Sequence, residues 1–81
     1  MGFGNEEMNV LCEWFLKCEE LGMLDLRRNA FTATAWDLLA EVVGREGAMP
    51  KLKEIFVRGN KDRPSAKLRE ACGKRGIKLT G

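Results

Sequence analysis

A nine-residue pattern of leucine and leucine-like residues occurs twice in this sequence at a fixed interval. The first copy is LGMLDLRRN at 21–29 and the second is LKEIFVRGN at 52–60, so the interval is 52 − 21 = 31 residues. In the first copy Leu24 and Leu26 alternate with Met23, Asp25 and Arg27, which is the period of a short strand with one buried side, and Ile55 and Val57 hold the same places in the second copy. The chain is therefore expected to repeat one structural unit, with strands over 23–26 and 54–57.

Helical patterns lie between these strands. Apolar residues at three- and four-residue steps predict a first helix from about residue 6 to 20, with Asn5 as its N-cap. A second helix is expected after Thr32 or Thr34 and before the glycine- and proline-containing break at 44–50.

A third helix is predicted over Ala66–Arg75, with Leu68, Ala71 and Cys72 on its inner face, and a last strand over 77–79. Helices and strands therefore alternate in an α/β chain that forms one domain over residues 1–81.

Both copies fit L-x-x-L-x-L-x-x-N, and on these residues the chain resembles the leucine-rich-repeat family. The long helical half of the unit is similar to the ribonuclease-inhibitor-like class, whose further apolar positions are filled by Phe31, Ala35, Leu39 and Val43. This resemblance implies an α/β solenoid segment with a short parallel sheet on its concave side and helices on its convex side. It also implies a structural ladder made by Asn29 and Asn60, whose amides bond the backbone of the turns.

The resemblance covers about residues 6–79 and divides them unequally. The helix at 6–20 is the trailing half of a preceding repeat, 21–50 is the first full unit, and 51–81 is a degenerate terminal unit. In that last unit Asp62 stands where the first has Phe31, and the final strand comes early. The chain is therefore expected to be a C-terminal piece of a larger solenoid.

Side chains between the strand leucines should face solvent, because successive strand residues point to opposite sides. We expect them to form rows, with Asp25, Phe56 and Lys78 in the middle and Arg27 beside Arg58. An aromatic side chain among arginines matches the composition of interface hot spots, so a protein partner is expected on this surface. The alternative is a solvated sheet face with one incidental apolar residue. The candidate partner-binding residues are Met23, Asp25, Arg27, Glu54, Phe56, Arg58 and Lys78.

Charge is distributed unevenly along the chain. Residues 1–44 carry three basic and eight acidic side chains, a net of 3 − 8 = −5, and residues 45–81 carry eleven and four, a net of 11 − 4 = +7. A basic C-terminal half suggests nucleic-acid or polyanion binding as an alternative function. Its basic residues are spread over strand, loop and several helix faces, which makes nucleic acid an unlikely partner. The uncapped ends of a solenoid also suggest self-association.

Several function classes lack the residues they need. With no histidine and no tyrosine, the usual catalytic combinations are missing, so neither an enzyme nor a cofactor or metal is expected. Trp14 and Trp36 are expected to pack in the core or between repeats, and the cysteines to act mainly as small buried apolar residues. The sequence has neither a membrane-spanning stretch nor a signal-peptide pattern, so the expected location is cytoplasmic.

Overall fold

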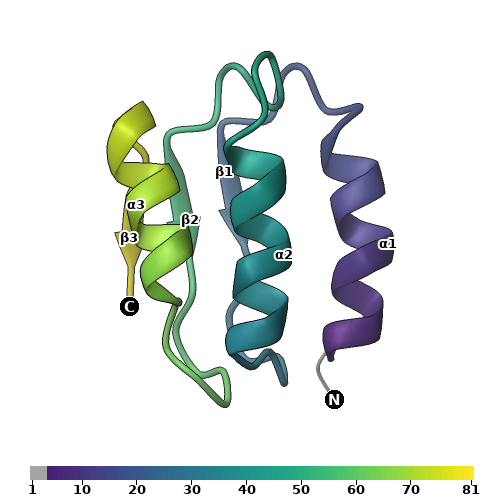
Figure 1. Ribbon diagram of the computed structural model, residues 1–81, viewed down its shortest axis with the longest axis vertical. Helices are drawn as coiled ribbons and strands as arrows, with labels where there is room; N and C mark the ends of the chain where they lie inside the picture. The colour runs from purple at the N-terminus through teal and green to yellow at the C-terminus, as the bar shows by residue number, and fades with distance from the viewer. Residues whose placement is uncertain (1–3) are drawn as a thin grey trace.

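A computed structural model describes residues 4–81 of this protein, which form two layers. The elements are, in chain order, α1 (Asn5–Phe15), β1 (Met23–Asp25), α2 (Ala33–Val43), β2 (Glu54–Phe56), α3 (Ala66–Arg75) and β3 (Lys78–Thr80). The strands form a parallel sheet in the order β1-β2-β3. The helices stand side by side on one face of this sheet, with α1 and α3 at the two ends of the row (Figure 1). The expected α/β architecture with a short parallel sheet is thus confirmed.

The two copies of the repeated pattern form neighbouring strands, with Leu24 of β1 opposite Ile55 of β2. α3 also begins and ends at the predicted residues. Gly76 follows it with a φ of 69°, the left-handed conformation that ends many helices and favours glycine.

The first helix is shorter than predicted. α1 ends at Phe15 rather than near Glu20. The N–H of Lys17 donates to the Trp14 carbonyl, and that of Cys18 donates to the Phe15 carbonyl, so the chain tightens into turns after the helix.

The register of β3 corrects the predicted rows. Lys78 lies opposite Glu54, and Thr80 lies opposite Phe56, so the predicted row of Asp25, Phe56 and Lys78 is wrong. From β2 to β3 the equivalent residues are separated by 78 − 54 = 24 positions, whereas β1 and β2 are separated by 54 − 23 = 31. The predicted row was displaced by two residues. A shift of two keeps every side chain on its own face of the sheet.

Asn60 bonds backbone groups of both units. Its Nδ2 donates to the Leu26 carbonyl at 2.8 Å and to the Val57 carbonyl at 2.9 Å, and its Oδ1 accepts from the Phe31 N–H at 3.2 Å. The Asn29 Nδ2 donates to the Leu26 carbonyl at 3.0 Å, within its own turn. Both asparagines thus donate hydrogen bonds to carbonyl groups that lie in the turns, after the strands end.

The first turns of α1 and α2 are joined by a reciprocal pair of hydrogen bonds. Asn5 is not the N-cap of α1 as predicted, because Gly4 holds that position. The Asn5 Nδ2 instead donates to Thr32 Oγ1 at 2.7 Å, and its Oδ1 accepts from the Thr32 N–H at 3.2 Å. Thr32 is the N-cap of α2, yet its side chain makes no capping bond to its own helix.

Asp62 supplies the start of α2 with an acceptor from the following unit. Its Oδ2 accepts the Ala33 N–H at 3.0 Å, and its carbonyl oxygen accepts the Trp36 Nε1–H at 3.0 Å. A carboxylate is favoured at a helix N-terminus, where backbone N–H groups have no partner within the helix. Asp62 stands where the first unit has the apolar Phe31, and sequence analysis interprets this difference as degeneration of the repeat. In the structure, Asp62 stabilises the contact between the two units.

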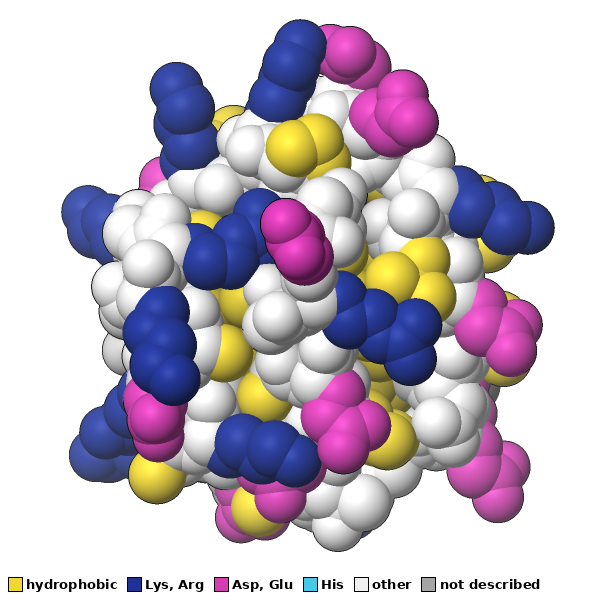
Figure 2. All heavy atoms as spheres, turned by 45° about the horizontal axis from the view of Figure 1, so that its top comes forward, with side chains coloured by type: hydrophobic (Ala, Val, Ile, Leu, Met, Phe, Trp, Pro, Cys, Tyr) yellow, Lys and Arg dark blue, Asp and Glu magenta, His cyan; other side chains and the backbone are white. Residues whose placement is uncertain are grey.

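The charge asymmetry of the sequence becomes an asymmetry in space, because the units follow one another along the row of helices. Lysine and arginine side chains gather mainly on the α3 side of the molecule, and aspartate and glutamate mainly on the α1 side (Figure 2). The two ends of the row therefore carry opposite charge.

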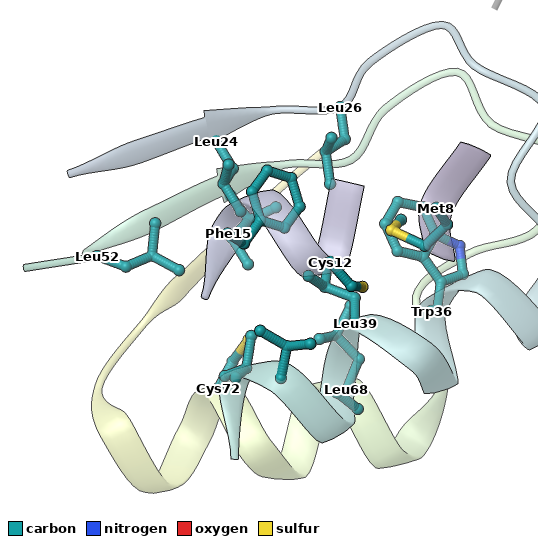
Figure 3. Packing of buried hydrophobic residues seen from close by; sticks show 14 of the residues in the cluster. Met8, Cys12, Phe15, Leu24, Leu26, Trp36, Leu39, Leu52, Leu68 and Cys72 are labelled. Carbon is teal, nitrogen blue, oxygen red and sulfur yellow. The ribbon is translucent and has the colours of Figure 1, made fainter. Parts of the chain in front are cut away.

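A single apolar cluster lies between the two layers. It takes side chains from the strands and from all three helices (Figure 3). Trp36 is fully buried and meets the Phe31 ring edge to face, with 5.4 Å between the centroids, so its predicted place in the core is confirmed. Trp14 does not pack in this core. Trp14 is 69% exposed, because it lies on the flank of α1 that no described residue covers.

Replacing Asn60 with alanine is expected to lower the free energy of unfolding by about 2 to 3 kcal/mol, because part-buried polar groups left without partners cost about 1 to 3 kcal/mol. Urea denaturation followed by circular dichroism measures this. Asn9→Ala is the matched control, because Asn9 is exposed on α1 and its loss should change stability by less than about 0.5 kcal/mol. Equal losses in the two variants would contradict the linking role of Asn60.

Candidate functional site

The sheet presents one face away from the helices, and we call it the open face. Alternation along the strands buries the central residues Leu24 and Ile55 against the helices and turns their neighbours outward. Met23 is 59% exposed, while Phe56 is half-buried. The open face consists of Met23, Asp25, Glu54, Phe56, Lys78 and Thr80, with Arg58 at its rim and the Arg27 side chain turned over it from beyond the end of β1.

The centre of the open face is an ordered group of an acid, a base and an aromatic ring. The Arg27 guanidinium carbon lies 5.2 Å from the centroid of the Phe56 ring, within the range of a cation–π contact. Asp25 holds this guanidinium in place with two hydrogen bonds, from Nε at 2.9 Å and from Nη2 at 2.7 Å. The two oxygens and two nitrogens form the bidentate geometry that favours arginine over lysine.

These hydrogen bonds shift the ionisation of the acid. The side chain and backbone N–H of Arg27 both donate to Asp25, and they lower the pKa of its carboxyl to about 2. The carboxylate in turn raises the pKa of Arg27. Both groups are charged throughout the physiological pH range, so the open face carries a fixed ion pair at its centre.

Arg58 behaves differently from Arg27. Its backbone carbonyl accepts the Arg28 N–H at 2.9 Å, which continues the pairing of the two chains beyond the strands. Its side chain is exposed and forms no ion pair with any described residue. Arg58 therefore offers a free cation at the rim, whereas the Arg27 guanidinium is turned back onto Asp25 and Phe56.

Thr80 is a member of the open face that sequence reasoning missed. Its Oγ1 donates to Glu54 Oε2, and it lies beside Phe56 in the sheet. The prediction that Lys78 faces outward already implied that Thr80 does too, because residues two apart in a strand share a face. Lys78 itself lies in the row of Met23 and Glu54.

Metal ligands and cysteine thiols are two further kinds of site that the described residues could form. None of the groups that they bring together holds three side chains able to ligate a metal. Cys12 and Cys72 are buried, and burial raises the pKa of each thiol to about 11. The negative charge of Glu41 adds to the rise at Cys12, and the positive charge of Arg75 partly opposes it at Cys72. Helices that combine the length and the apolar character needed to cross a bilayer are absent from residues 4–81.

Thiol labelling should distinguish the three cysteines. At pH 8, a buried thiol with a pKa of about 11 is ionised to roughly one part in a thousand, so Cys12 and Cys72 should react slowly with iodoacetamide in the folded protein. Cys18 is only half-buried and should be labelled first. Mass spectrometry of the folded protein should find one rapid label, and three after denaturation. Rapid labelling of Cys12 in the folded protein would contradict its position in the core.

The Asp25 carboxyl should titrate near pH 2 in an NMR titration of its side-chain carbon. In Arg27→Gln, which loses the positive charge and most of the donors, the midpoint should rise toward the ordinary value of about 3.9. Because the pKa is lowered in the folded state, the pair stabilises the fold above about pH 4 and this contribution disappears as the pH falls through about 2. An unchanged midpoint in Arg27→Gln would show that Arg27 does not hold this carboxylate.

No family model matches the sequence, and neither a curated protein nor a solved structure was found to match it. We therefore infer the function of this chain from its own geometry.

Proposed function

We propose that this chain is a segment of a leucine-rich-repeat solenoid that binds another protein through its open face and catalyses no reaction itself. In such a solenoid the open face would be the concave side. The observation that carries the proposal is the pair of apolar side chains, Met23 and Phe56, displayed among charges on a sheet face that no described helix covers.

Support for the repeat comes from the way the two units fit together. β1 and β2 pair in parallel at the interval of the repeated pattern. Asn60 also bonds the backbone of both units, as an asparagine ladder would require. Each unit has an apolar side that it buries only against its neighbour, which is the physical basis of a stacked repeat.

Support for partner binding comes from the order already present at the centre of the open face. Asp25 and Phe56 both hold Arg27, so less side-chain entropy is lost when a partner covers it. An aromatic ring with an arginine stacked on it is the composition found at the centre of protein interfaces. Glu54, Lys78 and Arg58 surround this centre with charges of both signs, which favours a partner with a mixed polar rim.

A cytoplasmic location is part of the same proposal. Cys12, Cys18 and Cys72 are all free thiols. Free cysteines fit a reducing compartment, where disulfides rarely persist.

Site-specific crosslinking tests the proposed face. A photoreactive benzoylphenylalanine placed at position 56 should trap one protein from a cell extract on illumination, because Phe56 lies at the centre of the proposed contact. The same group at position 16 is the control, since Leu16 is 39% exposed on the chain after α1 and lies outside the open face. The same products from both positions, or none from position 56, would contradict the proposal.

The trapped protein then allows a quantitative test. Phe56→Ala should weaken its binding by about tenfold or more, because truncation of a central aromatic residue costs upwards of about 1.4 kcal/mol. Leu16→Ala should leave the affinity unchanged. Isothermal titration calorimetry measures both, and circular dichroism confirms that each variant is folded. Equal affinity of the Phe56→Ala variant and the wild type would exclude the open face as the binding site.

A further inference from the structure

The outer flank of α1 is an apolar surface without a cover among the described residues. Asn5 turns one side of α1 toward α2, and helical spacing places Glu7, Val10, Leu11 and Trp14 on the opposite side. Val10 is 62% exposed and Trp14 69% exposed. We call this surface, with its four residues, the head.

The corresponding flank of α2 shows what a cover does. Val42 occupies the place of Leu11 one interval later, at 42 − 11 = 31 residues, and it is only 5% exposed, whereas Glu41 and Arg45, in the places of Val10 and Trp14, remain exposed. Leu11 remains half-buried. Leu11 thus lies where a neighbouring helix can pack, and the exposed side chains of Val10 and Trp14 extend this apolar surface.

The other end of the helix row is basic. A groove beside α3 is lined in part by Arg58, Lys61, Arg63, Arg69 and Leu79. None of its four cations forms an ion pair with a described residue. The acid that also lines this groove, Asp62, already accepts the Ala33 N–H.

The outer flank of α3, on the side away from α2, has no side chain at Gly73. Lys67 and Arg75 turn one side of this helix toward α2, where they bond Glu41 and the Val43 carbonyl. Arg69 and Gly73 therefore lie on the opposite side, and a Cβ atom added to Gly73 would meet nothing within 4 Å. We call this surface the tail, made of Gly73 and the groove cations Arg58, Lys61, Arg63 and Arg69.

We propose that the chain associates with a second copy of itself, head to tail. The α1 end of one copy docks on the α3 end of the next, and Trp14 covers the flat flank at Gly73 while Arg69 meets Glu7. Charge favours this pairing over head to head or tail to tail, because residues 1–44 carry a net of 3 − 8 = −5 and residues 45–81 a net of 11 − 4 = +7. Two different surfaces meet, so the contact repeats from copy to copy and does not close as a two-fold dimer.

Helices and side chains make this contact rather than the edges of the sheet. The N–H groups of Leu26 and Arg28 donate to chain 54–58, so the Arg27 N–H between them points toward the free edge of β1. Asp25 Oδ1 accepts this N–H at 3.2 Å. The Asp25 carboxylate therefore occupies the first outward backbone donor after β1.

Sedimentation velocity over a wide concentration range tests the association. The wild type should form larger species as its concentration rises, and added salt should weaken them because exposed charges are screened. Trp14→Ser removes the apolar centre of the head, and Arg69→Glu reverses a charge of the tail. Each should weaken association by about tenfold or more. Arg45→Glu is the matched control, because it makes the same charge change in the exposed loop after α2 and should have little effect.

Mixing the two variants gives the sharpest result. The intact head of Arg69→Glu should dock on the intact tail of Trp14→Ser, so the mixture should form a one-to-one dimer although neither variant associates alone. Docking of head on head or of tail on tail cannot give this outcome, because every such contact would involve two like ends. A wild type that stays monomeric at every concentration, or a mixture that does while the wild type associates, would overturn the proposal.

Two further measurements separate this association from other interactions. Phe56→Ala should leave self-association unchanged, because Phe56 belongs to the open face and to neither end. A DNA duplex that binds the wild type tightly while the protein remains monomeric would favour the polyanion alternative and overturn head-to-tail docking.

Discussion

The side-chain amide of Asn60 connects the parts of this small protein. It donates to the carbonyl groups of Leu26 and Val57, which follow β1 and β2, and it accepts the N–H of Phe31. It therefore fixes the position of the turn after β2 relative to the turn after β1. That placement brings Asp62 to the start of α2, where it replaces the missing side-chain cap. It also puts the Asp62 carbonyl within reach of the buried Trp36 indole. In a chain of this size, few apolar contacts are available to correct a misplaced turn.

Two periodicities in the sequence predicted most of the fold. Alternation around Leu24 and Ile55 predicts the strands and their buried sides, and three- and four-residue steps predict α2 and α3. The first helix was predicted too long, because helical periodicity continues past Phe15 while the backbone has already turned. Periodicity describes which side of an element is apolar, and it describes poorly where that element ends.

The open face was less predictable than the fold. Its outward residues follow from alternation, but the row beside Phe56 depends on the register of β3, which follows a unit shorter than the one before it. The orientation of Arg27 was also beyond prediction. Only the three-dimensional arrangement shows that its guanidinium turns back to Asp25 and the Phe56 ring instead of extending beside Arg58. The exposure of Trp14 depends on whether another element covers α1. The sequence of α1 alone does not show whether such an element is present.

The carboxylate of Asp25 has a consequence for the behaviour of the chain at high concentration. A strand at the edge of a sheet offers a template on which any extended peptide can add, and this is a common start of amyloid growth. β1 is only three residues long, and the backbone N–H of Arg27, two residues after it, is occupied by the carboxylate of Asp25. Other molecules that approach this end of the protein then meet side chains rather than a free strand edge. Copies at high concentration can therefore associate through these side chains without forming a fibril of stacked strands.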